Sequence, residues 1–353
     1  MALSTIYIAP SSLLLFSQIC VSCLLLTAGI YFFVRRGKRL HCLLSGTLLF
    51  WFFLHVKDLL LLSDATPSEY LEYLCFSIDM LAVPTCAFLL FELTRPGWFT
   101  WRKMVLHELP FLVLLVLFVC TSSTVVYYID LAVSLFYSLW VTMLLFRAIP
   151  VYNRVLRENF SNTENLDLEW LWKLLIFFII FLAIWVYSAF QISMNADILY
   201  NVGSGILWAV ICYNIYKQQP LVLAEETTSP VPETTARDTY QPEFAKELVR
   251  LFEEQKIWLN PHLTIAEVAQ QLGSNRTYLS DYLNRTLGTT FYEYVNEYRV
   301  RAVAEQLAIP ECTLTIEAIS ENCGFNSVST FRRAFIRRYG CTPTRYRDQQ
   351  IRK

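Results

Sequence analysis

The stretch that decides the fold is GFNSVSTFRRAFIRRYG, residues 324–340. It begins and ends on a glycine, and it places Phe331 and Phe335 four residues apart, on one face of a helix. Arg332, Arg333 and Arg337 lie to the other side of that helix. A basic amphipathic helix suits either a membrane surface or a nucleic acid, so its surroundings have to decide between the two.

The stretch belongs to the second copy of an internal repeat. The first copy is IAEVAQQLGSNRTYLSDYLNRTLG, residues 265–288, and the second is IEAISENCGFNSVSTFRRAFIRRYG, residues 316–340. Each copy predicts a helix, a turn that contains a glycine, a second helix and a closing glycine suited to a left-handed C-cap. This is the helix-turn-helix pattern, and two copies in tandem are much stronger evidence than one.

The outward faces of the two second helices supply the candidate DNA contacts. Leu279 and Leu283 in the first copy match Phe331 and Phe335 in the second, and we expect all four to face the core. Arginines on the other face can grip a guanine edge or a phosphate, which favours DNA over a merely solvated helix face here. The candidates are Arg276, Thr277, Ser280, Asp281, Asn284, Arg285, Ser329, Arg332, Arg333 and Arg337.

The segment between the repeats, Phe291–Leu307, predicts one continuous helix about 25 Å long. A rigid helix of this length can hold two recognition helices roughly one DNA turn apart, about 34 Å. One chain could then occupy two successive major grooves without dimerising.

The rest of the chain is far more apolar. The whole sequence is 55% hydrophobic and 17% charged, whereas soluble proteins contain about 25% charged residues. The apolar residues concentrate before residue 217, in runs of about the length that crosses a bilayer. The predicted spans are Ser12–Val34, Leu40–Leu62, Leu71–Leu93, Val105–Cys120, Val125–Phe146, Leu171–Phe190 and Ile198–Ile215.

The basic residues between these seven runs predict the topology. Lys and Arg follow the first, third, fifth and seventh runs, and they are absent from the alternate segments 1–11, 63–70, 121–124 and 191–197. Basic loops mark the cytoplasmic side of a membrane. We therefore expect a multi-pass protein of the cytoplasmic membrane, with the N-terminus outside and the helix-turn-helix domain in the cytoplasm.

A few polar residues fall inside the predicted spans. Asp79 and Asp130 lie deepest, where a charge costs roughly 2.5–3.5 kcal/mol, so both are candidate ligand or ion contacts. The structural alternative is that an aspartate pairs with a lysine of another helix, while residues such as Lys57, Glu92 and Lys173 reach toward an interface. Pro84 is expected to kink the third span.

Other features of the sequence are less specific. Residues 218–241 are rich in Pro, Thr and Glu and predict a flexible linker between domains 1–217 and 242–353. The ten cysteines are scattered, and the CxxC of Cys20 and Cys23 has no ligand partner nearby, so we expect packing cysteines and no metal site. Because no catalytic or nucleotide-binding motif occurs, we expect neither an enzyme nor a cofactor.

Several features of the C-terminal third match one family. They are the paired repeats, Tyr294 and Arg299 in the connecting helix, GFNSVSTFRRAF at 324–335, and GCTPTRYR at 340–347. On these residues, 242–350 resembles the DNA-binding domain of the AraC/XylS family of bacterial transcription regulators. The resemblance implies a seven-helix all-α domain that binds promoter DNA and recruits or positions RNA polymerase. Asp281 and Val303 depart from the family pattern, so we expect the second motif to carry more of the affinity.

Together these observations predict an all-α protein: a seven-helix transmembrane bundle followed by a cytoplasmic domain with two helix-turn-helix motifs. We expect a membrane-bound transcription regulator whose bundle senses a small-molecule or membrane signal through its packing or through homodimer formation. Two alternatives stay open. The membrane half could be a transporter or an enzyme with a regulatory tail, or a passive anchor from which proteolysis of the linker releases the DNA-binding domain.

Overall fold

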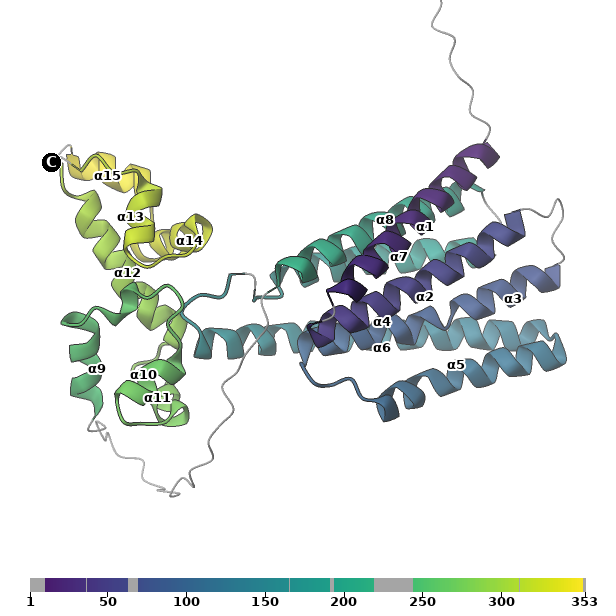
Figure 1. Cartoon of the computed structure of the whole chain (residues 1–353), viewed down its shortest axis with the longest axis horizontal. Helices are drawn as coiled ribbons and strands as arrows, with labels where there is room; N and C mark the ends of the chain where they lie inside the picture. The colour runs from purple at the N-terminus through teal and green to yellow at the C-terminus, as the bar shows by residue number, and fades with distance from the viewer. Residues whose placement is uncertain are drawn as a thin grey trace, which may run out of the picture. The chain divides into compact units, whose positions relative to one another are not determined.

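The computed structural model describes residues 10–35, 37–62, 69–164, 166–190, 194–218, 244–310 and 312–351 (Figure 1). The chain divides into two compact units. Unit 1 comprises Met1–Tyr152 and Leu168–Pro220, and unit 2 comprises Asn153–Asp167 and Leu221–Lys353. The predicted all-α class is confirmed for the described residues, where every named element is a helix.

Unit 1 consists of long apolar helices joined by short segments. They are α1 (Pro10–Val34), α2 (Arg39–Leu62), α3 (Glu69–Asp79), α4 (Ala82–Thr94), α5 (Trp101–Thr121), α6 (Thr124–Asn159), α7 (Glu169–Phe190) and α8 (Met194–Lys217). The last residues of α6 belong to unit 2.

Six stretches of the described residues are long and apolar enough to cross a membrane, with α3 and α4 counted as one stretch. They overlap the first five predicted spans and the last one. The remaining predicted span, Leu171–Phe190, coincides with the 22-residue helix α7, in which several side chains lie outside the described set. The length and composition of these helices are compatible with a membrane location.

The outer surface of unit 1 is apolar. Phe16, Leu106 and Phe136 expose 65%, 68% and 70% of their surfaces, and many other large apolar side chains are exposed with them. Continuous apolar surface on this scale is unfavourable in water, whereas hydrocarbon surrounds it without penalty. This distribution of side chains favours lipid as the surroundings of unit 1.

The predicted kink in the third span is present as a break between α3 and α4. Pro84 lies in the first turn of α4, where its ring is tolerated, but it has no N–H to donate to the carbonyl of Met80. That carbonyl instead accepts a hydrogen bond from the N–H of Val83, at 3.1 Å. The proline thus explains why one span contains two helices.

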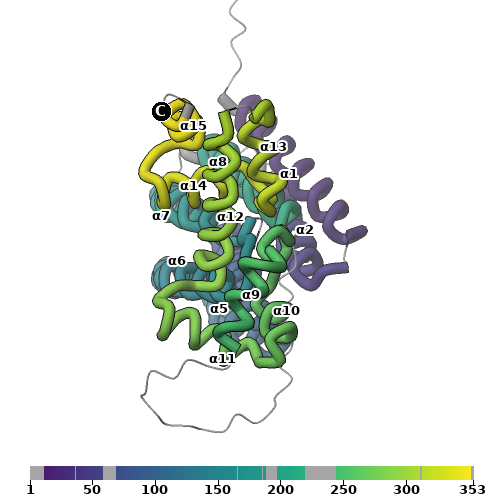
Figure 2. Tube along the Cα trace, turned by 90° about the vertical axis from the view of Figure 1, so that its left-hand side faces the viewer, coloured from purple at the N-terminus to yellow at the C-terminus, as the bar shows by residue number. Residues whose placement is uncertain are grey.

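In addition to the end of α6, the described residues of unit 2 form seven α-helices, as the family resemblance implied. They are α9 (Phe244–Glu253), α10 (Ile265–Gln271), α11 (Arg276–Asp281), α12 (Phe291–Leu307), α13 (Ile316–Asn322), α14 (Val328–Tyr339) and α15 (Pro343–Ile351). Two short helices accompany them, the 3₁₀-helix η1 (Ile257–Leu259) and the π-helix η2 (Tyr282–Thr286). In Figures 1 and 2, α12 runs between the pair α10 and α11 and the pair α13 and α14.

Capping residues set where these helices begin. The side chains of five N-cap residues each accept a hydrogen bond from an N–H in the first turn, and such a cap stabilises a helix by about 1 kcal/mol. They are Thr264, Asn275, Thr290, Thr315 and Ser327. Asn275 and Ser327 begin the second helix of each motif, so the chain fixes locally where each recognition helix begins.

The recognition helix of the first motif differs from a regular helix. After the six residues of α11 the backbone continues as η2, and the N–H of Leu287 donates to the carbonyl of Tyr282. The sequence repeat gave no sign of this π-turn. The closing glycines Gly288 and Gly340 are left-handed as predicted, with φ of 64° and 69°.

The structure also bears on the predicted boundaries. Gln218 is the only described residue of the predicted linker 218–241, so that prediction lies almost wholly outside the described residues. Residues 153–167 lie in the predicted membrane domain, but they group with the C-terminal residues in unit 2. The contacts that hold them there are given below.

We expect Gly324→Ala to destabilise unit 2 strongly. Gly324 has φ of +82°, and an added Cβ would lie 2.7 Å from the carbonyl oxygen of Trp258. Gly273→Ala is a matched control, because Gly273 is also left-handed, at +62°, but nothing lies within 4 Å of its Cβ position. The control should lower the free energy of unfolding of unit 2 by about 1–2 kcal/mol, and Gly324→Ala should lower it clearly more.

Alkylation of Cys323 in the full chain measures this difference. The thiol is 1% exposed, and burial raises its pKa to about 11, so it reacts only when the domain opens. Equal alkylation rates in the two variants would contradict the packing role of Gly324.

Candidate nucleic-acid interface and membrane cavity

The apolar residues of the second helix of each motif face inward, as the sequence predicted. Leu279, Leu283, Phe331 and Phe335 are at most 1% exposed and lie in the core of unit 2. Seven of the ten candidate DNA contacts are exposed: Thr277, Asp281, Arg285, Ser329, Arg332, Arg333 and Arg337. The other three, Arg276, Ser280 and Asn284, are half-buried.

Several of the exposed arginines form ion pairs on the surface of unit 2. Arg332 lies 3.3 Å from Glu317 of α13, and Arg337 lies 3.0 Å from Glu293 of α12. Exposed ion pairs of this kind contribute only about 0–1 kcal/mol. A phosphate could therefore replace either carboxylate at little cost.

The first motif carries an acid on its outward face. Asp281 lies 3.4 Å from Arg285, one turn along the same helical segment, and both side chains are largely exposed. On the same face, the amide of Asn284 donates to the hydroxyl of Ser280 at 3.2 Å. Because the acid offsets the charge of Arg285, this face is less cationic than α14. That the second motif carries more of the affinity for DNA stays a prediction.

A buried arginine holds the core between the motifs. Arg299 of α12 is 1% exposed, and no carboxylate pairs with it in the described part of the chain. Its Nε donates to the carbonyl of Trp258 at 2.8 Å, and its Nη2 donates to the carbonyl of Asn260 at 2.7 Å. Burial lowers the pKa of Arg299 to about 10, so the guanidinium stays charged at pH 7.

The same contact region joins the second motif to η1. The guanidinium carbon of Arg299 lies 5.9 Å from the centre of the Phe325 ring. Gly324, beside it, packs directly against the backbone of Trp258 and Leu259. The turn of the second motif and the segment that precedes the first motif are thus fixed to one side chain of α12.

The loop after α6 completes the surroundings of Arg299. Ser161 is fully buried, and its carbonyl and hydroxyl oxygens accept hydrogen bonds from Nη1 and Nη2 of Arg299 at 3.4 and 3.2 Å. The N–H of Ser161 donates to the carbonyl of Leu263 at 3.1 Å, and Phe160 forms an antiparallel bridge with Thr264. The segment Asn159–Ser161 therefore docks beside the start of the first motif through an isolated β-bridge and one further backbone hydrogen bond.

This docked segment also reaches a candidate DNA contact. Nη1 of Arg276 donates to the side-chain oxygen of Asn159 at 3.1 Å. The amide of Asn296 on α12 donates to the carbonyl of Ser161 at 3.2 Å. Nothing in the sequence pattern indicated these contacts, because they join residues more than a hundred positions apart.

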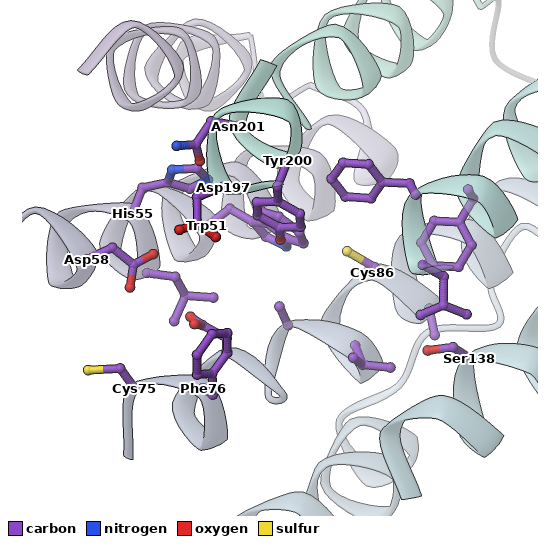
Figure 3. A pocket seen from close by; sticks show the side chains of 18 of the residues that line it. Trp51, His55, Asp58, Cys75, Phe76, Cys86, Ser138, Asp197, Tyr200 and Asn201 are labelled. Carbon is purple, nitrogen blue, oxygen red and sulfur yellow. The ribbon is translucent and has the colours of Figure 1, made fainter. Parts of the chain in front are cut away.

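A cavity of about 400 Å³ lies inside unit 1 (Figure 3). Helices α1, α2, α3, α4, α6, α7 and α8 contribute to its wall. In Figure 3 the side chains of His55, Asp58, Asp197 and Asn201 lie together on one side of this space, and those of Cys86 and Ser138 lie on the other.

Asp79 and Asp130, the predicted ligand contacts, lie in different surroundings. Asp79 lines the cavity and lies 3.0 Å from Lys57 of α2, so it also forms the interhelical pair that the structural alternative described. Asp130 of α6 is 1% exposed and does not line the cavity. Its carboxylate oxygens have no hydrogen-bond partner within the described part of unit 1.

Comparisons with known proteins concern unit 2. The family model described as "Helix-turn-helix domain" matches residues 268–349. An uncharacterized HTH-type transcriptional regulator of Bacillus subtilis, YtdP, is 34% identical over 88 residues, which are 25% of this chain and 11% of that protein. An HTH-type transcriptional regulator of Mycobacterium tuberculosis is 35% identical over 83 residues, which are 24% of this chain and 31% of that protein.

A third relative is the RCS-specific HTH-type transcriptional activator RclR of Escherichia coli. It is 29% identical over 86 residues, 24% of this chain and 30% of that protein. The chain thus spans less than a third of the length of each of these relatives. A solved structure of a protein of unknown function from Listeria innocua aligns with 31% of this chain and 97% of its own, at 23% identity and a TM-score of 0.27.

The family model and the three relatives identify the C-terminal domain as an AraC-type helix-turn-helix domain, the kind found in DNA-binding transcription regulators.

We expect Arg332→Ala and Arg333→Ala to weaken binding to a specific promoter more than binding to random DNA. An arginine that reads a guanine edge contributes about 1–3 kcal/mol of discrimination, whereas a phosphate contact weakens both equally. Arg250→Ala is the control, because Arg250 is an exposed arginine of α9 outside both motifs. Fluorescence anisotropy with the full chain measures the affinity for each DNA and so the ratio of the two affinities. An equal loss of affinity for promoter and random DNA would contradict base reading by α14.

Proposed function

We propose that this protein is a membrane-bound, sequence-specific DNA-binding transcription regulator. Its membrane half senses a signal, and its two helix-turn-helix motifs read successive major grooves of promoter DNA. The protein needs no second polypeptide to carry the signal from the membrane to the DNA. Its further partners are RNA polymerase and the bilayer, and it can act as a monomer or a homodimer.

The observation that carries this proposal is the presence of an AraC-type domain on the same chain as six membrane-length stretches. The domain exposes two outward faces with arginines, and the stretches expose apolar side chains. A soluble regulator would have no use for the second feature, and a simple transporter would have no use for the first. Regulation of transcription from the membrane accounts for both.

A specific observation favours a sensing role over a passive anchor. An anchor needs no internal space, yet unit 1 contains a cavity of about 400 Å³ that is lined by charged and aromatic side chains. Polar groups inside a membrane are costly and usually serve a function. The cavity therefore supports a signal that acts on the membrane half.

Sequencing of DNA cross-linked to the protein, combined with cell fractionation, tests the function. We expect the bound promoters to be recovered with the intact chain in the membrane fraction. Recovery of the same promoters with a soluble fragment that contains only the C-terminal domain would instead support release by proteolysis. The absence of enriched sites would contradict sequence-specific regulation.

An epitope inserted between Thr121 and Thr124, where α5 ends and α6 begins, tests the orientation. The distribution of basic residues predicts that this turn lies outside the cytoplasmic membrane. An antibody should then bind the epitope on spheroplasts without permeabilisation. Binding only after permeabilisation would contradict a topology with seven spans and the DNA-binding domain inside.

A further inference from the structure

The cavity in unit 1 has the size of a small-molecule site. Its volume of about 400 Å³ lies within the range of roughly 300–1,000 Å³ that is typical of such sites. Its wall is largely apolar, with aromatic residues that include Trp51, Phe76, Phe181 and Tyr200. Phe181 stacks on Tyr200 with ring centres 4.7 Å apart, so this part of the wall is a fixed aromatic surface.

The charged groups of the cavity are mainly acidic. Four acidic residues line it: Asp58, Glu72, Asp79 and Asp197. Lys57 lies 2.6 Å from Asp58 and 3.0 Å from Asp79, so this one lysine serves two of the four acids. A ligand that brings a positive charge would balance the remaining acids, whereas an anion would be repelled.

One buried polar group at the cavity has no hydrogen-bond partner in the described part of the chain. His55 is 3% exposed and lines the cavity, and its Nδ1 forms no hydrogen bond with any described residue. The side chains of Trp51 and Cys86, which also line the cavity, interact with each other. Buried polar groups normally have partners, so Nδ1 of His55 is positioned to meet a ligand or its water.

We propose that this cavity binds an organic cation with an apolar or aromatic body. The acids attract its charge, and the indole and phenol rings can hold the cation on their faces while the apolar wall takes its body. The role of this ligand as the signal rests on the proposed function. Its binding to the cavity does not, and it can be measured without DNA.

Calorimetry with the full chain in detergent micelles tests the ligand class. The probes are tetraphenylphosphonium and the smaller benzyltrimethylammonium, and tetraphenylborate is an anion that matches the first in shape. We expect saturable binding of at least one cation and none of the anion. Equal binding of tetraphenylborate, or no saturable binding of either cation, would overturn the proposal.

Two variants locate the site. Asp197→Asn removes a carboxylate that lines the cavity, and it should weaken cation binding by about tenfold. Asp130→Asn is the matched control, because Asp130 is a buried acid that does not line the cavity, and it should leave binding unchanged. An unchanged affinity in Asp197→Asn would place any cation elsewhere and overturn the site.

The function is tested separately. A cation that binds the cavity without changing promoter binding would leave the site intact and contradict its role as the signal. A failure to bind promoter DNA both with and without the cation would contradict the proposed function and leave the cation site untouched.

A second inference rests on the docked segment Asn159–Ser161. Its carbonyl and hydroxyl at Ser161 take two hydrogen bonds from Arg299, and its Asn159 takes one from Arg276, a candidate phosphate contact of the first motif. The segment is continuous with α6, a single helix of 36 residues that begins in unit 1. This helix is the covalent route by which a change in unit 1 can reach the docked segment.

We infer that this segment is an inhibitory contact through which the membrane half controls the first motif. In the docked state Asn159 engages Arg276, and DNA has to displace that hydrogen bond before a phosphate can take the guanidinium. A signal that withdraws Asn159 removes the hydrogen bond that competes with DNA at Nη1 of Arg276.

Asn159→Ala tests this control, because it removes the acceptor and leaves the contacts of Ser161 in place. We expect the full chain to bind promoter DNA roughly three- to tenfold more tightly. Asn162→Ala is the control in the same loop, since its side chain accepts from the N–H of Glu164 instead. The inference would be overturned if Asn159→Ala did not raise the affinity for promoter DNA. It would also be overturned if Asn159→Ala raised the affinity by the same factor in a protein that already carries Arg276→Ala.

Discussion

The need to satisfy one buried guanidinium organises the C-terminal unit. Arg299 is 1% exposed, and desolvating a charge without hydrogen bonds would cost several kcal/mol. No single neighbour provides enough acceptors, so the chain brings carbonyls from η1 and from Asn260, the side chain of Asn296, and both oxygens of Ser161. Segments far apart in sequence are thereby held around α12.

The placement of the two helix-turn-helix motifs depends on this arrangement. Gly324 can lie against the backbone of η1 only because it has no side chain, and that contact sets the turn of the second motif. Leu263 and Thr264, which pair with the docked loop, precede α10 and set the start of the first motif. The segments that supply acceptors to Arg299, η1 and the docked loop, thus also contact the turn of the second motif and the start of the first.

Local sequence patterns predicted the helices of this fold, but they could not predict the contacts between residues far apart in the sequence. The spacing of Leu279 with Leu283 and of Phe331 with Phe335 identified the inward faces correctly, because helical periodicity is a local signal. The predicted bounds Phe291–Leu307 of the connecting helix are confirmed for the same reason. The docking of Ser161 and the cavity wall could not be predicted, since each joins helices or loops whose contacts no periodicity encodes. Asp79 was singled out by its depth, but its partner Lys57 was visible only in the packed bundle.

The loop that follows the membrane-length helix α6 belongs to the same unit as the helix-turn-helix motifs. Hydrogen exchange of the Ser161 amide in the full chain, embedded in lipid nanodiscs, is a direct test of this arrangement. We expect slow exchange, because that N–H donates to the carbonyl of Leu263 in a buried setting, and faster exchange when Arg299 is changed to Lys, which has fewer donors. Exchange of the Ser161 amide at the rate of an unstructured loop in the unmodified protein would contradict it.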